Sequence, residues 1–94
     1  MVLMRTHRAL RALTETVKTY QPRHWTIDSA KVAYFNADSH REFHELSEAF
    51  DVLTGNRPMR DDSQHQCVSQ WEWHDWRISL AVFVDAPTGY EATA

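Results

Sequence analysis

Two histidines of this 94-residue chain have a spacing that suits metal binding. His40 and His44 are four residues apart, and on a helix this places both imidazoles on one face, within reach of one ion. A further ligand would have to come from His65, Cys67 or His74. Because Arg41 follows His40, the His-Glu-x-x-His pattern of zinc proteases is absent. We expect surface histidines near a helix start, keep a metal-dependent enzyme as the least favoured interpretation, and predict no cofactor.

The single cysteine is the other residue that could do chemistry. In a strand, His65 and Cys67 would point to the same side, so a thiolate and a base could meet. The alternative is that Cys67 is a small buried hydrophobic residue. The chain has only two glycines, and they stand apart, so a phosphate-binding loop is not encoded. We therefore predict that the protein is not an enzyme.

A cluster of tryptophans is the most distinctive feature of the sequence. Trp71 and Trp73 would share one face of a strand, and Trp76 would pair with Trp73 across a turn at His74-Asp75. One interpretation is that these rings fill the core, since a small domain needs their bulk. The other is a half-exposed patch that binds a protein, with Arg77 beside it, because Trp and Arg are favoured anchors of interfaces.

The exposed interpretation depends on which residues lie opposite the indole rings. We expect their face to continue through Ser69 and Cys67 and to lie opposite Arg77 and Ser79 of the partner strand. The main core would then be formed by the alternating apolar residues Ile78, Leu80, Val82 and Val84. Both interpretations of the cluster stay open at this stage.

Charge is unevenly distributed along the chain. Residues 1–24 contain five basic residues and one acidic residue, whereas residues 25–94 contain five basic and twelve acidic residues. A basic stripe on the first helix could contact phosphates, so nucleic-acid binding is the alternative function. The residues of this stripe are Arg5, Arg8, Arg11 and Lys18. Its other interpretation is an ordinary solvated helix face.

The acidic part of the chain could meet a basic partner. Glu42, Glu45, Glu48 and Asp51 would lie along one polar flank of a helix, and Asp61-Asp62 follow in the next loop. Such a surface speeds association with a basic protein. The alternative is a face that only keeps the protein in solution.

Two helices are predicted from apolar spacing. The first spans about residues 3–20, where Leu10, Leu13 and Val17 recur at helical spacing and Pro22 ends it. The second spans about residues 39–54. It begins with a Ser39-x-x-Glu42 capping box and ends before Gly55, and Phe43, Leu46, Phe50 and Leu53 form its apolar face.

Residues 24–36 are rich in β-branched and aromatic types, which are typical of strands. They form either a hairpin, Trp25–Asp28 with Lys31–Phe35 turning near Asp28-Ser29, or one long strand. We favour the hairpin. Residues 66–73 and 76–85 are predicted strands joined by His74-Asp75, and 55–65 is a predicted polar loop. The fold class is therefore α+β, with two helices on one face of a three- or four-stranded antiparallel sheet, in the order α-β(β)-α-β-β.

Length and composition indicate one domain over residues 1–94, with a frayed tail at 86–94. A lone cysteine favours the cytoplasm, because small secreted domains usually carry several. The sequence has no apolar run long enough to span a membrane. We expect a small non-catalytic protein-binding module, a stoichiometric inhibitor, adaptor or regulatory factor, that uses the tryptophan hairpin and the acidic helix. A homodimer would be formed through an apolar seam of the first helix.

Overall fold

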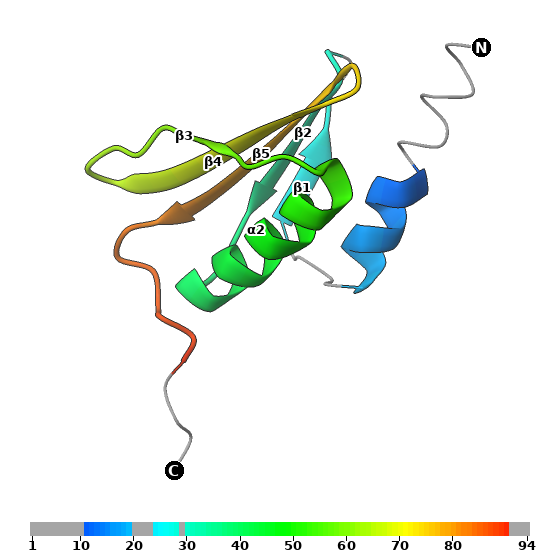
Figure 1. Cartoon of the computed structure of the whole chain (residues 1–94). Helices are drawn as coiled ribbons and strands as arrows, with labels where there is room; N and C mark the ends of the chain where they lie inside the picture. The colour runs from blue at the N-terminus through cyan, green and yellow to red at the C-terminus, as the bar shows by residue number, and fades with distance from the viewer. Residues whose placement is uncertain (1–10, 20–23, 29, 91–94) are drawn as a thin grey trace, which may run out of the picture.

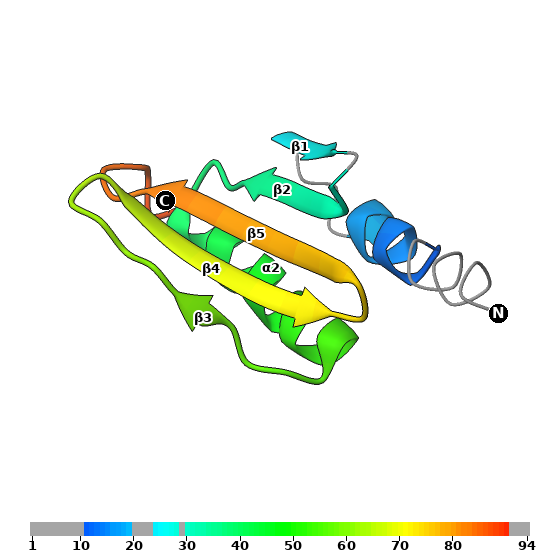
Figure 2. The same cartoon turned by 90° about the horizontal axis from the view of Figure 1, so that it is seen from above.

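The computed structural model describes residues 11–19, 24–28 and 30–90 of the chain. The described part of the first helix covers residues 11–19. It is followed by strands and a second helix in the order β1 (His24–Ile27), β2 (Val32–Asn36), α2 (His40–Thr54), β3 (Met59–Arg60), β4 (Gln66–Trp73) and β5 (Trp76–Phe83). Both helices lie on the same side of the sheet (Figures 1 and 2). The α+β class predicted from the sequence is confirmed.

The sheet has five strands in the order β1-β2-β5-β4-β3. β5 pairs parallel with β2, whereas the other three pairings are antiparallel. The prediction of a three- or four-stranded antiparallel sheet is therefore wrong. α2 carries the chain from β2 across the sheet, and the final strand returns to the middle beside β2 (Figure 2). The two-residue β3 lies within the predicted loop, and so short a segment has no alternation from which to predict a strand.

α2 forms where its capping signals predict it. The Ser39 side chain accepts a hydrogen bond from the Glu42 N–H at 3.1 Å. At the other end, Gly55 has a left-handed φ of 68° and its N–H donates to the Asp51 carbonyl at 2.9 Å. The buried residues of the helix are Phe43, Leu46 and Phe50. These face the sheet and anchor the helix on it.

The hairpin interpretation of residues 24–36 is confirmed, since β1 pairs antiparallel with β2. The Asp28 carboxylate shapes the turn by accepting the N–H groups of Ala30 at 2.9 Å and Val32 at 3.1 Å. The Asp28 N–H donates to the Val32 carbonyl at 3.0 Å. Lys31 takes a positive φ of 61° within this turn. An aspartate that holds the backbone two and four residues ahead is the local cause of the reversal.

The segment after β5 returns to the start of α2. The carbonyls of Pro87 and Thr88 accept the N–H groups of His40 at 3.0 Å and Arg41 at 2.8 Å. These amides belong to the first turn of the helix, which has no intrahelical partners for them. Within the predicted tail, Pro87 and Thr88 therefore contact the helix start, and residues 91–94 lie outside the described residues.

The core is one cluster between the helices and the sheet. Its members come from the first helix, β2, α2, β4 and β5, and from Ala37 just after β2, so every large element contributes to it. They are Leu13, Val17, Ala33, Phe35, Ala37, Phe43, Leu46, Phe50, Trp71, Trp73, Trp76, Ile78, Leu80 and Val82. The opposite face of the sheet carries no helix among the described residues (Figure 1).

Candidate functional site

The three tryptophans of the last hairpin lie in the core. Trp71, Trp73 and Trp76 expose 1%, 8% and 7% of their surface. Trp73 pairs with Trp76, and Trp71 therefore pairs with Ile78 rather than with Arg77 or Ser79. The predicted opposition of the indoles to Arg77 and Ser79 is wrong, because a two-residue turn fixes the register and directly opposite residues share a face. The core interpretation is confirmed, and the proposed aromatic contact patch is not a surface.

One of these indoles also ties the sheet to α2. The Trp71 Nε1–H donates to Asp51 Oδ1 at 2.8 Å. The Phe50 ring packs edge-on against Trp71 with centroids 5.3 Å apart, and it contacts Phe35 at 5.0 Å. Asp51, predicted to be part of an acidic contact flank, is therefore a half-buried acceptor that holds the hairpin beneath the helix.

The remaining acidic residues of α2 are mostly engaged within the chain. Glu42 Oε1 accepts the Asp38 N–H at 3.2 Å, next to the helix start. Glu45 forms an ion pair with Arg41 at 3.0 Å. The Glu48 carboxylate makes no hydrogen bond or ion pair with another described residue, although the backbone of Glu48 is part of α2. Arg77 is exposed and lies 3.7 Å from Glu72, too far for a strong pair.

The histidine and cysteine candidates are not brought together. His40 Nε2 lies 3.0 Å from the Val84 carbonyl, which links the helix start to the end of β5, while His44 is exposed. Within residues 11–19, 24–28 and 30–90, no group of three potential metal ligands is assembled. Cys67 is half-buried and packs against the core, which fits the interpretation as a small hydrophobic residue.

Two of the four residues of the basic stripe, Arg5 and Arg8, lie outside the described residues. Of its other members, Lys18 is exposed, and Arg11 lies 3.7 Å from Glu15 on the same helix, with both side chains largely in solvent. Such a pair contributes little to stability. The described part of the helix therefore leaves the interpretation as a solvated face in place.

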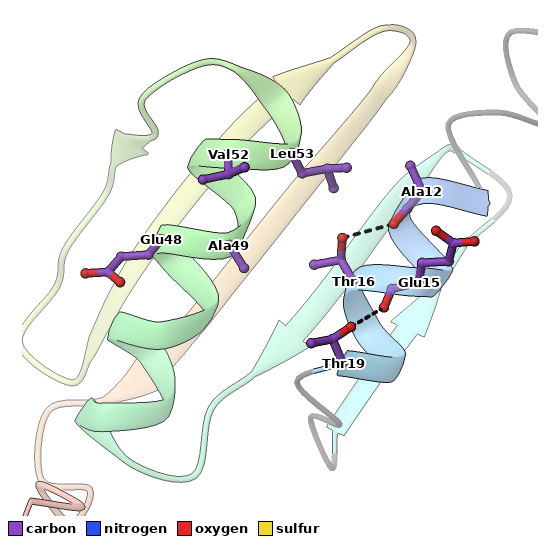
Figure 3. A pocket seen from close by; sticks show the side chains of 8 residues that line it. All are labelled: Ala12, Glu15, Thr16, Thr19, Glu48, Ala49, Val52 and Leu53. Carbon is purple, nitrogen blue, oxygen red and sulfur yellow. Dashed lines mark hydrogen bonds between the residues drawn. The ribbon is translucent and has the colours of Figure 1, made fainter.

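A groove between the two helices was not predicted from the sequence. It has a volume of about 530 Å³ and opens on the side away from the sheet (Figure 3). We call it the inter-helix groove. It is lined by Ala12, Glu15, Thr16 and Thr19 of the first helix and by Glu48, Ala49, Val52 and Leu53 of α2.

The walls of the inter-helix groove are apolar despite two threonines. The Thr16 hydroxyl donates to the Ala12 carbonyl, and the Thr19 hydroxyl donates to the Glu15 carbonyl, each at 3.0 Å. These hydroxyls are satisfied within their own helix, so the methyl groups are left toward α2 (Figure 3). On the other wall Leu53 points toward the first helix, and Val52, which is 85% exposed, stands at the rim of the groove (Figure 3).

The groove is continuous with the core below it and acidic at its margins. Ala12 and Leu53 are half-buried and pack against the core cluster. Glu15 and Glu48 stand on opposite margins, and their carboxylates turn away from the apolar walls (Figure 3). The sequence signal was a second set of small apolar residues on each helix, at Ala12, Thr16 and Thr19 and at Ala49 and Val52.

The opposite side of the sheet has a polar hollow of about 510 Å³. Asn56, Arg57 and Met59 line it together with Gln70, Glu72 and Arg77 of the central strands. The Asn56 amide donates to the Glu72 carbonyl at 3.4 Å. Its opposite charges lie side by side, so it lacks the concentrated positive field that would attract a phosphate.

One carboxyl among the described residues has a clearly shifted pKa. Hydrogen bonds from the Arg60 guanidinium, at 3.1 and 2.9 Å, lower the pKa of Asp62, and the Val68 N–H contributes at 3.2 Å. Burial opposes this shift. The pair lies between β3 and β4 and orders that loop, so its pKa reflects local structure rather than catalysis.

Comparisons with protein-family models, curated proteins and solved structures found no match to this chain. Neither helix, over the part that is described, is long and apolar enough to cross a bilayer.

Proposed function

We propose that this protein is a non-catalytic protein-binding module that receives an amphipathic helix of its partner in the inter-helix groove. It would act by contact, as a stoichiometric inhibitor, adaptor or regulatory factor. The observation that supports this most directly is an apolar groove whose rim carries Val52, an almost fully exposed apolar residue. This surface replaces the tryptophan hairpin as the binding site, and Glu48 is the predicted contact residue that it retains.

The shape and chemistry of the groove suit a helix. Two helices that lie over a sheet with a channel between them offer a seat for the apolar stripe of a third helix. Its walls consist of alanine, valine and leucine side chains and threonine methyl groups, which contact apolar atoms without leaving polar groups unpaired. Seating a partner there would remove Val52 from water and extend the existing core outward.

Charge selects among amphipathic helices. Glu15 and Glu48 lie on the two margins of the groove, and the body of the chain is acidic. A partner helix with Lys or Arg on both sides of its apolar stripe could place their aliphatic stems on the walls and their charges near these carboxylates. The expected partner is therefore basic, and a helix with acidic flanks should bind less well.

A small-molecule site is less well supported. Sites for small molecules usually direct several polar groups inward to orient the ligand. Here the hydroxyls of Thr16 and Thr19 donate to their own helix, and the Glu15 and Glu48 carboxylates turn outward.

The lone Cys67 is unpaired, which fits a protein that acts in a reducing compartment such as the cytoplasm.

The test uses a model peptide, a 14-residue Leu/Lys amphipathic helix, added to the ¹⁵N-labelled chain. We expect amide chemical-shift changes that concentrate at Thr16, Ala49, Val52 and Leu53. A Leu/Glu peptide of the same length should bind at least about tenfold more weakly, because one lost charge interaction at a partly exposed site already approaches that factor. Shifts centred on the open sheet face, or equal binding of both peptides, would contradict the proposal.

The matched variants are Val52→Lys and Met59→Lys. Val52 and Met59 are both exposed apolar residues, but Met59 lies on the edge strand β3, away from the groove. V52K should abolish the peptide-induced shifts, whereas M59K should leave them unchanged. A pull-down from native cells with and without nuclease, repeated with V52K, then separates a groove-bound protein from nucleic acid held by the basic residues.

A further inference from the structure

The two edges of the sheet are protected to different degrees. β3 has only two residues, follows Pro58, and carries Arg60, whose guanidinium is fixed by Asp62. Short length, proline and charge are the usual ways to block an edge strand. β1 at the other edge has four residues, His24–Ile27, all exposed, with no lysine, glutamate or proline. Among the described residues, no strand pairs with its outer side.

The backbone pattern shows which groups of β1 are free to pair. The Asp28 N–H donates to the Val32 carbonyl, so 28 and 32 form a hydrogen-bonded pair of the hairpin. Such pairs alternate along an antiparallel ladder, which makes Thr26 and Tyr34 the next one. The N–H and C=O groups of Trp25 and Ile27 must then point away from β2, toward the open edge.

The side chains of β1 are complementary to those of a second β1 in one antiparallel register. With Thr26 opposite Thr26 of the second copy, Trp25 lies opposite the second copy's Ile27, and His24 lies opposite the second copy's Asp28. These are a hydroxyl pair, an aromatic with a β-branched residue, and a base with an acid, all of which favour cross-strand pairing. The outward backbone groups of Trp25 and Ile27 also meet in this register as hydrogen-bonded pairs.

We propose that two copies of this chain associate through β1, antiparallel about a twofold axis that passes between the two Thr26 residues. The interface would be isologous. The two sheets would join into one continuous sheet, with the helices of both copies on the same side. Trp25 and Ile27 share the helix-covered face with Phe35 and Ala33, and Trp25 stacks on Phe35 at 6.1 Å. They expose 43% and 39% of their surface, part of which the second copy would cover.

A four-residue strand pair is a small interface, so the dimer should be weak and concentration-dependent. Sedimentation equilibrium of the full chain, from about 10 μM to about 1 mM, should show reversible dimerisation in the range expected of small interfaces. A chain that stays monomeric throughout this range would overturn the proposal. Capture of a strand from another protein by a monomeric chain would overturn it as well.

Cysteine pairing tests the register. In a Cys67→Ala background, Thr26→Cys places two sulfurs at a non-hydrogen-bonded pair with Cα atoms about 4.5 Å apart, which suits a disulfide. His24→Cys lies on the same face, but the two copies of residue 24 would be about 13 Å apart, from four residues of strand rise. We expect a disulfide-linked dimer from T26C and none from H24C. Equal cross-linking of both variants, or none by a dimeric T26C, overturns the register.

A backbone variant tests whether the β1 edge, and no other surface, mediates dimerisation. Ile27→Pro removes an outward N–H without touching the bonds to β2, since proline is tolerated at an edge strand. Two hydrogen bonds are lost per dimer, which should weaken association about 10- to 100-fold. Val52 lies on α2 and not on the β1 edge, so the V52K variant should dimerise like the unmodified chain. If I27P dimerises unchanged while its circular dichroism stays native, another surface mediates association.

Discussion

The β4–β5 hairpin has the residue types of a binding surface but is buried, whereas the inter-helix groove and β1 have residues of ordinary type that are exposed. The hairpin holds three tryptophans, the residues most often found at binding hot spots, and all three are buried in the core. The margins, at the inter-helix groove and β1, expose residues such as Val52 and Ile27 that attract no attention in the sequence. Exposure is decided by where a strand lies relative to the covering helices, and the central position of β4 and β5 seals their larger side chains.

Replacing a sealed indole should have the largest effect. Trp71→Ala removes the largest fully buried side chain among the described residues, leaves a cavity against Phe50, and deprives Asp51 of its donor. We expect the free energy of unfolding to fall by about 3–5 kcal/mol, from lost burial and the cavity together. Urea denaturation followed by circular dichroism measures it. A loss below about 1 kcal/mol, the scale of an ordinary surface substitution, would contradict the burial of this ring.

The docked C-terminal segment should give the next largest effect. Gly89 has a φ of 79°, and a Cβ there would lie 2.8 Å from Ser39 Oγ and 2.9 Å from Arg41 Cβ. Gly89→Ala should therefore cost about 1–2 kcal/mol. It should also raise the hydrogen-exchange rates of the His40 and Arg41 amides, which Pro87 and Thr88 otherwise protect. Unchanged exchange at these two amides would show that the segment does not protect them.

Replacing the half-exposed Trp25 of β1 by alanine tests the contrast with the buried Trp71. Trp25→Ala removes an indole that is 43% exposed and stacks on one side against Phe35. We expect a loss of about 1 kcal/mol, since only about half of the side chain leaves an apolar environment. The measurement should be made at low protein concentration, where the monomer predominates. A cost equal to that of W71A would remove the distinction between the two regions.

At the groove, we expect a substitution that abolishes peptide binding but leaves the stability of the fold unchanged. Val52→Lys replaces a solvent-exposed β-branched residue on a helix with a better helix former, so the free energy of unfolding should change by less than about 0.5 kcal/mol. Thermal denaturation of V52K beside M59K checks this. A large loss would mean that Val52 stabilises the fold, which would weaken its role as a contact residue.

The smallest effect concerns pH. Arg60 lowers the pKa of Asp62 in the folded protein, so the pair stabilises the protein above the ordinary aspartate pKa of about 4. This contribution is lost as pH falls through the lower folded pKa. The stability difference between the unmodified chain and Asp62→Asn should therefore be small at pH 7 and vanish at low pH. A difference that grows on acidification would contradict this sign.

Local signals in the sequence predict the elements well where the cause is local. Ser39, Glu42 and Gly55 delimit α2, and Asp28 turns the first hairpin, because each acts on backbone groups within a few residues. The register of β4 and β5 was also within reach. A two-residue turn that pairs Trp73 with Trp76 necessarily pairs Trp71 with Ile78, so the opposition to Arg77 was an avoidable error.

Features that join distant segments could not be read from the sequence. The parallel pairing of β2 with β5 and the two-residue β3 depend on how α2 crosses the sheet. The inter-helix groove depends on the distance between the first helix and α2 when both are packed on the sheet. Small residues at Ala12, Thr16 and Ala49 are compatible with close packing as well as with a channel, and only the assembled core decides between them.

The last strand of the chain occupies the middle of the sheet, and this affects when the protein can fold during synthesis. Until β5 has left the ribosome, β2 and β4 have no common neighbour, and Ala33 and Phe35 have a strand on one side only, without Ile78 and Leu80 on the other. Pairings between residues so far apart in sequence form slowly, since the intervening chain must be closed first. A nascent chain released before about residue 83, where β5 ends, should therefore be unable to complete its core and should be prone to aggregation and degradation.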